Sequence, residues 1–182
     1  PAPMTINVTG TDPSCSYTTD GSVSVTAGGG TPIITYLWDG GSTDAVVPGL
    51  AANNYGVTAT DGNDCTINGS FTIAAPLPVT VTASAIDANC DGAADGSVSA
   101  VAGGGTNPIS LVWDVPIPNT GTPIAGLIAG TYTVTVTDGM GCTVTDPATI
   151  NQPDLLELTI SMTPATCSGD ADGTATVTAT GG

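Results

Sequence analysis

The chain contains no lysine, arginine or histidine among its 182 residues, while 16 acidic residues give it a formal net charge of −16. Binding to nucleic acid depends on basic side chains that neutralise phosphates, so that class of function is excluded. Attraction to anionic lipid also needs basic clusters, and no run approaches the roughly 20 apolar residues of a membrane span. We therefore expect no nucleic-acid partner and no direct insertion into a membrane.

Catalysis also has little support in this composition. Histidine and lysine, the usual bases, are absent, so a hydrolase would need a pair of carboxylates. No such pair recurs along the chain outside its turn segments. We predict that the chain is not an enzyme.

Few residues are aromatic (4%) or charged (9%), but 40% are hydrophobic and fall in alternating runs such as 22–26 and 132–137. Alternation with period two is typical of a strand with one face on a core and the other in water. Asp-Gly, Gly-Gly and Pro-Gly turn signals separate the runs, as in an all-β sandwich. We expect six strands per repeat, in repeat 2 near 79–85, 97–102, 108–113, 122–125, 131–137 and 143–150, and the loop after each tryptophan is a candidate for a seventh short strand.

A repeat of about 76 residues organises the chain. Cys15, Cys90 and Cys167 are each followed at the same offset by an Asp-Gly pair. Self-similarity at a fixed period is the signature of a tandem array. We divide the chain into β-sandwich repeat 1 (1–75), repeat 2 (76–152) and a partial repeat 3 that holds the first two strands (153–182). Further landmarks recur as Trp38 and Trp113, Tyr55 and Tyr132, 60–62 and 137–139, and Cys65 and Cys142.

The cysteines indicate disulfides, because there is no histidine and no Cys-x-x-Cys spacing for zinc. Disulfides imply an oxidising, extracellular location. Pairing within a repeat joins Cys15 to Cys65 and Cys90 to Cys142, whereas pairing across the boundaries joins Cys65 to Cys90 and Cys142 to Cys167. Six strands that alternate in direction favour pairing within a repeat, and a seventh strand would reverse that inference.

Two further features suggest ligand sites. Trp38 and Trp113 lie on the third strand, where a tryptophan of an immunoglobulin-type sandwich packs in the core; the alternative is an exposed platform for glycan contact. The other feature is a calcium-like loop, whose weak candidate ligands are Asp87, Asn89, Asp91 and Asp95. This loop matches the opening of an EF-hand, but its twelfth position is Val98 and the pattern does not recur in repeats 1 and 3. Calcium is therefore only a weak cofactor candidate, and no other cofactor is expected.

An ordered set of motifs runs from Cys90 to Thr143: Asp-Gly-Ser-Val-Ser, Gly-Gly-Gly-Thr, Trp-Asp, Gly-Leu, Gly-Thr-Tyr-Thr-Val-Thr-Val-Thr-Asp-Gly and Gly-Cys-Thr. This set resembles the SprB-type repeat of very large cell-surface adhesins in gliding Bacteroidota. The resemblance covers essentially the whole chain. It implies an immunoglobulin-like repeat in a secreted filamentous adhesin that is carried along the cell surface during gliding motility. Repeat 1 departs from the pattern at 53–56, which reads Asn-Asn-Tyr-Gly.

We expect tandem, disulfide-stapled β-sandwiches arranged as a rod, acting as a stalk segment of an extracellular adhesin or surface filament. One rival is a self-assembling filament or surface-layer subunit in which strands of another molecule complete 153–182. Another is a carbohydrate-binding module that uses the two tryptophans. The expected partners are neighbouring repeats of the same chain, identical chains in a filament, and surface glycans.

Overall fold

The computed structural model describes residues 2–115 and 119–182. These residues form fourteen β-strands and no helix, which confirms the predicted all-β class. The chain divides into two compact units: Pro1–Thr80 with Gly103–Ile109 and Thr137–Thr143, and Val81–Ala102 with Ser110–Val136 and Val144–Gly182. Within the described ranges, no helix is long and apolar enough to cross a membrane. Residue 1, where repeat 1 begins, lies outside them.

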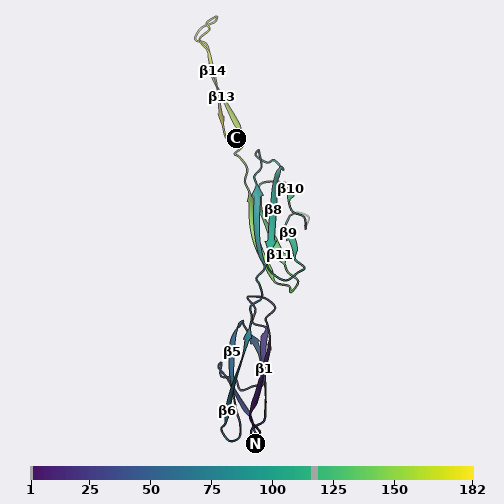
Figure 1. The fold of residues 1–182 in the computed structure, drawn as a ribbon. Helices are drawn as coiled ribbons and strands as arrows, with labels where there is room; N and C mark the ends of the chain where they lie inside the picture. Colours follow the sequence, from purple (N-terminus) through teal and green to yellow (C-terminus); the bar gives the residue numbers. More distant parts are fainter. Residues whose placement is uncertain (1, 116–118) are drawn as a thin grey trace. The chain divides into compact units, whose positions relative to one another are not determined.

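The first sandwich belongs to the first unit and consists of two three-stranded antiparallel sheets. The strand orders are β1-β2-β4 in one sheet and β3-β5-β6 in the other. Figure 1 labels β1, β5 and β6 in this sandwich. The strand bounds are β1 (Thr5–Thr11), β2 (Gly21–Gly28), β3 (Thr35–Trp38), β4 (Val46–Leu50), β5 (Asn53–Thr60) and β6 (Thr66–Ile73).

Alternating valines of β2 build the core of this sandwich. Val23 and Val25 are 1% and 2% exposed and cluster with Trp38, Val57 and Ile73, which come from the facing sheet. Full burial of such side chains contributes about 1.5 to 3 kcal/mol each. The apolar residues that alternate in the sequence of β2 therefore form the hydrophobic layer between the two sheets.

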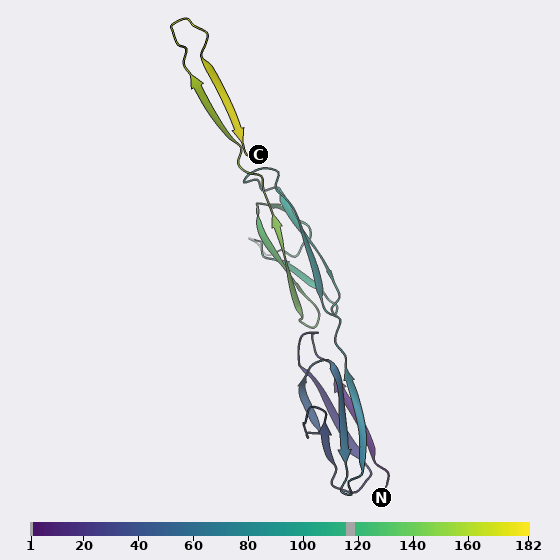
Figure 2. The ribbon, with the colours of Figure 1, turned by 90° about the vertical axis from the view of Figure 1, so that its left-hand side faces the viewer.

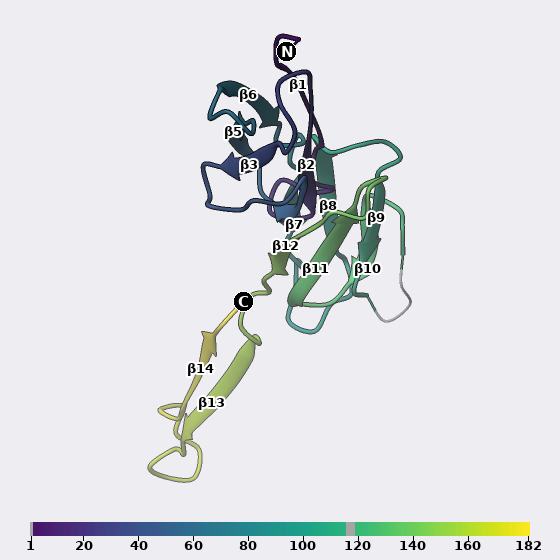
Figure 3. The same ribbon diagram turned by 90° about the horizontal axis from the view of Figure 1, so that it is seen from below.

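The strands of repeat 2 follow the same plan, with orders β10-β8-β7 and β12-β11-β9. Its core again contains a valine of the second strand, Val98, and a tryptophan, Trp113, and both are almost completely buried. Figure 3 shows β8, β9, β10 and β11 grouped together. The bounds are β7 (Thr80–Ile86), β8 (Gly96–Gly103), β9 (Ser110–Trp113), β10 (Ile124–Leu127), β11 (Gly130–Thr137) and β12 (Thr143–Ile150).

Repeat 3 contributes an antiparallel hairpin of β13 (Glu157–Thr163) and β14 (Thr174–Thr180). The two strands pair over seven positions, from Glu157 opposite Thr180 to Thr163 opposite Thr174. Every residue of both strands is exposed. In Figure 2 they form the yellow-green hairpin near the C-terminus.

Six strands in repeat 2 lie within two residues of the predicted bounds, which confirms the sequence pattern. The candidate seventh strand is absent from the described part of the loop after Trp113, where only an isolated bridge joins Trp113 to Asn119. Residues 116–118 of that loop lie outside the described ranges. The loop after Trp38 holds no strand either, and its backbone turns by a hydrogen bond from Trp38 N to Ser42 O of 2.9 Å.

The chain passes from β3 to β4 without reversing direction. β4 is antiparallel to β2, as β1 is, and β5 is antiparallel to both β3 and β6. Gly21 lies beside the last residues of both β4 and β6, Leu50 and Ile73, because a Cβ on Gly21 would lie 2.9 Å from Leu50 O and 3.4 Å from Ile73 Cδ1. The C-terminal ends of β4 and β6 are therefore at the same end of the sandwich. Therefore β1, β3, β4 and β6 all run one way. The six strands do not alternate strictly, so the condition that favoured disulfide pairing within a repeat is not met.

A tyrosine near the start of the fifth strand holds the preceding corner in both repeats. Tyr55 donates its hydroxyl hydrogen to Ala51 O at 2.9 Å, and Tyr132 donates to Ile128 O at 3.0 Å. Immunoglobulin-type sandwiches use a tyrosine in the same way, with its hydroxyl bonded to the backbone a few residues upstream. The recurring tyrosine is thus a part of the architecture.

Gly10 offers a sharp test of the packing between the two sheets of the first sandwich. A Cβ at this position would lie 2.6 Å from the Phe71 ring and 2.6 Å from the Ser22 carbonyl oxygen. We expect Gly10→Ala to destabilise the chain by about 1 to 3 kcal/mol, because overpacking forces the backbone to shift. Gly40→Ala is the control, since a Cβ there meets nothing within 4 Å. Thermal unfolding of the two variants measures the difference, and equal midpoints would contradict this packing.

Candidate functional site

The loop between the first two strands of each repeat carries one cysteine, and we call Cys15, Cys90 and Cys167 the loop cysteines. In repeat 1, Ser14 N and the Thr18 hydroxyl donate to Asp20 Oδ1 at 3.0 and 2.6 Å. Thr18 N donates to Cys15 O at 3.1 Å and closes the turn. Hydrogen bonds from Thr18, and then from Ser14, lower the pKa of Asp20 to about 2 because they stabilise its charged form.

The other two loop cysteines lie in the same kind of loop. Asn89 N donates to Asp95 Oδ1 at 3.1 Å, and Thr166 N donates to Asp172 Oδ1 at 3.0 Å. Side-chain hydrogen bonds from Asn89 and Thr166, followed by their backbone bonds, lower the pKa of Asp95 and Asp172 below the ordinary range. In every repeat, one carboxylate of an Asp-Gly pair therefore shapes the loop that holds the cysteine.

The turn between the fifth and sixth strands carries the second cysteine, and we call Cys65 and Cys142 the turn cysteines. Asp61 organises the first of these turns and is only 6% exposed. Its Oδ1 accepts from Asn63 N at 2.9 Å and Cys65 N at 3.0 Å, and its Oδ2 accepts from Thr31 N at 2.9 Å. These bonds, that from Thr31 foremost, lower the pKa of Asp61.

The second turn repeats this arrangement around Asp138, which is 7% exposed. The backbone N–H groups of Thr106, Met140 and Cys142 each donate to its carboxylate at 2.9 Å. The pKa of Asp138 is lowered chiefly by the bond from Thr106. The sequence interpretation treated these Asp-Gly pairs as turn chemistry and missed their buried carboxylates, although the recurrence of Thr-Asp-Gly three residues before each turn cysteine was the available signal.

The disulfide within the described part of the chain joins Cys15 to Cys142. Its S–S distance is 2.04 Å and its Cα atoms are 5.7 Å apart. Both cysteines belong to the first compact unit, although one comes from repeat 1 and the other from repeat 2. Beside the bond, Thr143 N donates to the Tyr17 hydroxyl oxygen at 3.1 Å. This pairing joins two repeats and was not among those that spacing suggested.

The remaining cysteines, Cys65, Cys90 and Cys167, are free and exposed. The structure thus corrects the expected pairs of Cys15 with Cys65 and of Cys90 with Cys142. It also corrects the alternative pairs of Cys65 with Cys90 and of Cys142 with Cys167.

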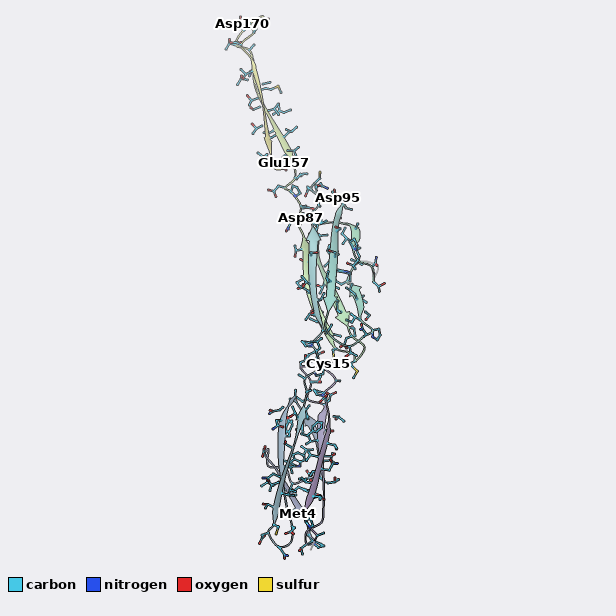
Figure 4. The ribbon with its side chains drawn as sticks, viewed as in Figure 1. Met4, Cys15, Asp87, Asp95, Glu157 and Asp170 are labelled. Atoms are coloured by element: carbon cyan, nitrogen blue, oxygen red, sulfur yellow. A yellow bond between two sulfur atoms is a disulfide. The ribbon has the colours of Figure 1, made fainter. Side chains whose placement is uncertain are left out.

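The reason is that Cys15 and Cys65 lie at opposite ends of their own sandwich. Asp12, close to Cys15, accepts from Ala74 N at 2.8 Å, and Ala74 follows the last residue of β6. Cys65 directly precedes the first residue of β6, at the other end of an eight-residue strand. Such a strand is roughly 26 Å long, whereas two Cα atoms more than about 7 Å apart cannot be bridged. Figure 4 labels Met4 and Cys15 at the two ends of this sandwich.

The candidate calcium ligands Asp87 and Asp91 bind amide groups at the end of repeat 2. Asp87 Oδ1 accepts from Asn151 N at 2.8 Å and from Asn151 Nδ2 at 3.2 Å. Asp91 Oδ1 accepts from Gln152 Nε2, and Gly92 N donates to Gln152 Oε1 at 3.0 Å. These two carboxylates therefore tie the loop to 151–152.

Asn89 and Asp95, the other two candidates, bind each other. Asn89 Nδ2 donates to Asp95 Oδ2 at 2.6 Å. Figure 4 shows Asp87 and Asp95 at the same end of the second sandwich. In the described ranges, no group of three or more His, Cys, Asp or Glu residues is placed to hold a metal ion. Calcium binding stays a prediction.

Trp38 and Trp113 are core residues, as the favoured interpretation predicted. Their side chains are 4% and 0% exposed. Trp38 Nε1 donates to Asp44 O at 2.9 Å, whereas Trp113 Nε1 has no hydrogen-bond partner among the described residues. A ring that is covered on both faces cannot stack on a sugar. The alternative interpretation, glycan contact through these two tryptophans, is therefore wrong.

Strand order, a core tryptophan and a corner tyrosine define this chain as immunoglobulin-like sandwich repeats. The SprB repeat family model matches residues 5–43 and 159–182. These segments cover β1 to β3 in repeat 1 and most of the β13–β14 hairpin in repeat 3. The predicted resemblance to the SprB-type repeat is thereby confirmed.

Among solved structures, the chain is similar to immunoglobulin-domain proteins at 12% identity. One is the Down syndrome cell adhesion molecule DSCAM, isoform 1.30.30, N-terminal eight Ig domains, with a TM-score of 0.42 over 83% of this chain and 25% of that one. Another is the amphioxus IgVJ-C2 molecule, with a TM-score of 0.32 over 81% of this chain and 96% of that one. This chain thus spans a quarter of the DSCAM structure, and likeness at these TM-scores carries no argument about function. No curated protein matches the chain.

The SprB repeat match supports a repeat region of the cell-surface adhesin type. An extracellular location fits the association of SprB repeats with cell-surface proteins.

The buried turn carboxylates predict a loss of stability in acid. The folded state lowers the pKa of Asp61, so the unfolded chain binds more protons, and the contribution of Asp61 to stability is present above about pH 4 and lost as pH falls through its lowered pKa. We expect Asp61→Asn to lower the melting temperature at pH 7, and we expect this effect to shrink as the pH falls through the lowered pKa of Asp61. Asp64→Asn is the matched control, because Asp64 lies in the same turn and is exposed. Melting temperature against pH is the measurement, and parallel curves for parent and Asp61→Asn would refute this role.

Proposed function

We propose that the chain is a structural stalk segment of an extracellular filamentous adhesin. One observation carries the proposal: the landmarks that recur between the repeats are parts of the fold. The tryptophans fill the cores, and the tyrosines hold the corners. A binding module repeated along an array would be expected to repeat exposed ligand-binding residues as well.

The remaining surface suits a spacer. Exposed faces of the strands carry mainly Thr and Ser, which bond across neighbouring strands, as Thr9 does with Ser24 at 2.7 Å and Ser84 with Ser99 at 2.8 Å. All formal side-chain charge is negative, so chains of this kind repel one another over about 8 to 10 Å at ordinary salt. Such a surface favours an extended, soluble tether over lateral association.

The disulfide gives the stalk a covalent route for tension. Its two cysteines are 127 residues apart in sequence. A pull on the chain ends passes through Cys15 and Cys142, so the segment between them, which includes β2 to β11, carries no tension while the bond is intact. Both sandwiches are thereby protected from being drawn out completely.

Stretching single molecules by their ends tests this role. Reduction should release 127 residues into the force path and add roughly 42 to 46 nm of extension after unfolding. Cys142→Ser should extend like the reduced parent, and Cys65→Ser like the oxidised parent, because Cys65 is free. If the oxidised chain extends as far as the reduced one, the bond does not carry load and the stalk proposal loses its mechanical basis.

A second candidate is a self-assembling subunit, and the exposed hairpin favours it. Leu158 and Ile160 of β13 are 66% and 63% exposed, as is Val177 of β14 at 61%. The corresponding residues of repeat 1, counted from the loop cysteine, are Ile6, Val8 and Val25, which lie in or against the core. In this alternative, a β3-β5-β6 type sheet of another molecule covers the hairpin.

Sedimentation velocity over a range of concentrations, without oxidant, separates the two candidates. For a stalk segment we expect a monomer at every concentration. Assembly through the hairpin would instead produce larger species that Ile160→Asp abolishes and Ser161→Asp retains. The two variants add the same charge at adjacent positions of β13, on opposite faces of the strand. Larger species with this pattern would replace the stalk proposal with strand exchange.

A further inference from the structure

Seven Asp-Gly pairs occur in the sequence, and the two residues of such a pair can react with each other. The backbone nitrogen of the glycine attacks Cγ of the aspartic acid, one water leaves, and a succinimide ring forms. Water then opens the ring on either side and gives aspartate again or isoaspartate, in which the backbone runs through the former side chain. The reaction needs no enzyme, metal or oxidant, but the chain must be free to bring the nitrogen to Cγ. The folded structure therefore decides which pair can react.

Five of the seven pairs are held by the loops and turns that position the cysteines. Hydrogen bonds lower the pKa of each carboxyl group in these pairs, and the protonated carboxyl is the form that loses water readily. The glycines are confined as well, since a Cβ on each would lie 3.2 Å or less from another atom of the chain. The five aspartates are Asp20, Asp61, Asp95, Asp138 and Asp172.

The Asn-Gly pair formed by Asn68 and Gly69 can react by the same route, with loss of ammonia. It lies within β6, where Gly69 pairs with Val57 of β5 in the antiparallel ladder. A Cβ on Gly69 would lie 2.7 Å from Val8 Cγ2. Strand pairing and packing together leave the backbone no freedom to close a ring, so this pair is protected.

Two Asp-Gly pairs remain, Asp39-Gly40 and Asp91-Gly92. A Cβ on either glycine would meet no described atom within 4 Å. Asp39 is nevertheless fixed by the backbone of β5, because its N donates to Gly56 O at 3.0 Å and its Oδ2 accepts from Gly56 N at 3.1 Å. Releasing the carboxylate of Asp39 therefore requires a movement of the sheet.

Asp91 and Gly92 are instead held by one side chain, that of Gln152. Gln152 Nε2 donates to Asp91 Oδ1, and Gly92 N donates to Gln152 Oε1 at 3.0 Å. The same amide group thus binds both reacting groups, the carboxyl and the nitrogen. All three residues are exposed. A glutamine side chain at the surface opens to water at a lower cost in free energy than a paired strand does.

We propose that Asp91-Gly92 is a site of spontaneous isoaspartate formation in the folded chain, and that Gln152 slows the reaction by holding both reacting groups. In the first step a bond forms between Gly92 N and Asp91 Cγ. A C–O bond of the protonated carboxyl breaks, and the proton of the nitrogen leaves with the hydroxyl as water. Hydrolysis adds one water back, so the product has the composition of the parent and nothing is oxidised or reduced.

The product changes the loop that Gln152 ties to the end of repeat 2. Isoaspartate inserts one additional carbon into the backbone of the turn that Ala93 N and Cys90 O close at 3.1 Å. The carboxylate that accepted from Gln152 also moves to a new position. Both effects loosen the loop. This modification goes beyond the stalk role and does not rest on it.

The experiment incubates the full, oxidised chain at neutral pH and follows isoaspartate with time. Peptides from a peptic digest are mapped by electron-transfer fragmentation, because a chain without lysine or arginine offers trypsin no site. The same chain unfolded in guanidinium chloride gives the intrinsic rates, which we expect to be similar for the seven pairs. In the folded chain we expect isoaspartate to accumulate first at Asp91 and more slowly at Asp39. Faster reaction at Asp39 or at any of the five held pairs, or equal rates at all seven, would overturn the proposal.

The role of Gln152 is tested by Gln152→Ala. We expect the rate at Asp91 to rise roughly fivefold, the factor for losing one hydrogen bond of ordinary strength, with the rate at Asp39 unchanged. Asn151→Ala is the matched control, because Asn151 is adjacent to Gln152 but binds Asp87. An unchanged rate at Asp91 in Gln152→Ala, or an equal rise in Asn151→Ala, would contradict the role of Gln152. A rise at all seven pairs would contradict it too, because it reports unfolding and not the release of one pair.

Discussion

The loops and turns of this protein are held by carboxylates in a chain that has no cationic side chain to pair with them. With Lys, Arg and His absent, the structural aspartates accept from N–H and O–H donors, some in their own loop and some in a neighbouring segment, as Asp61 accepts from Thr31 and Asp138 from Thr106. Burying a charge is costly unless it is hydrogen-bonded, and three backbone N–H groups offset that cost at Asp61 and again at Asp138. The same chemistry at Asp20 and its equivalents shapes the other end of each repeat. Both kinds of cysteine owe their position to these aspartates.

The direction of the strands determines what the cysteines can do. Because β3 and β4 run the same way, the loop after the first strand and the turn before the sixth strand lie at opposite ends of a sandwich. A bond between them cannot close one repeat, and Cys15 of repeat 1 is bonded instead to Cys142 of repeat 2. In the chain-entropy account, a link across 127 residues restricts the unfolded state by about 5 kcal/mol, more than a link across a shorter loop.

The residues that recur between repeats are used by the fold, and this supports the proposed structural role. Residues that recur, such as Trp38 and Tyr55, are used by the fold, and the SprB repeat match fits a cell-surface repeat region. Two features remain unsatisfied among the described residues: the free thiols and the uncovered face of the β13–β14 hairpin. In repeat 1 the equivalent face of the first two strands packs against Trp38, Val57 and Ile73 of the facing sheet.

The sequence by itself determined the all-β class, the strand positions, the core tryptophans and the family resemblance. These follow from local alternation and from landmarks that recur at a fixed period, and both can be read without knowing how strands are arranged. Only the tertiary structure decided the partner of Cys15 and the burial of Asp61 and Asp138. Spacing leaves the disulfide open because the choice depends on whether the chain reverses between β3 and β4. That step moves the chain from one sheet to the other, and no residue pattern in the sequence marked it.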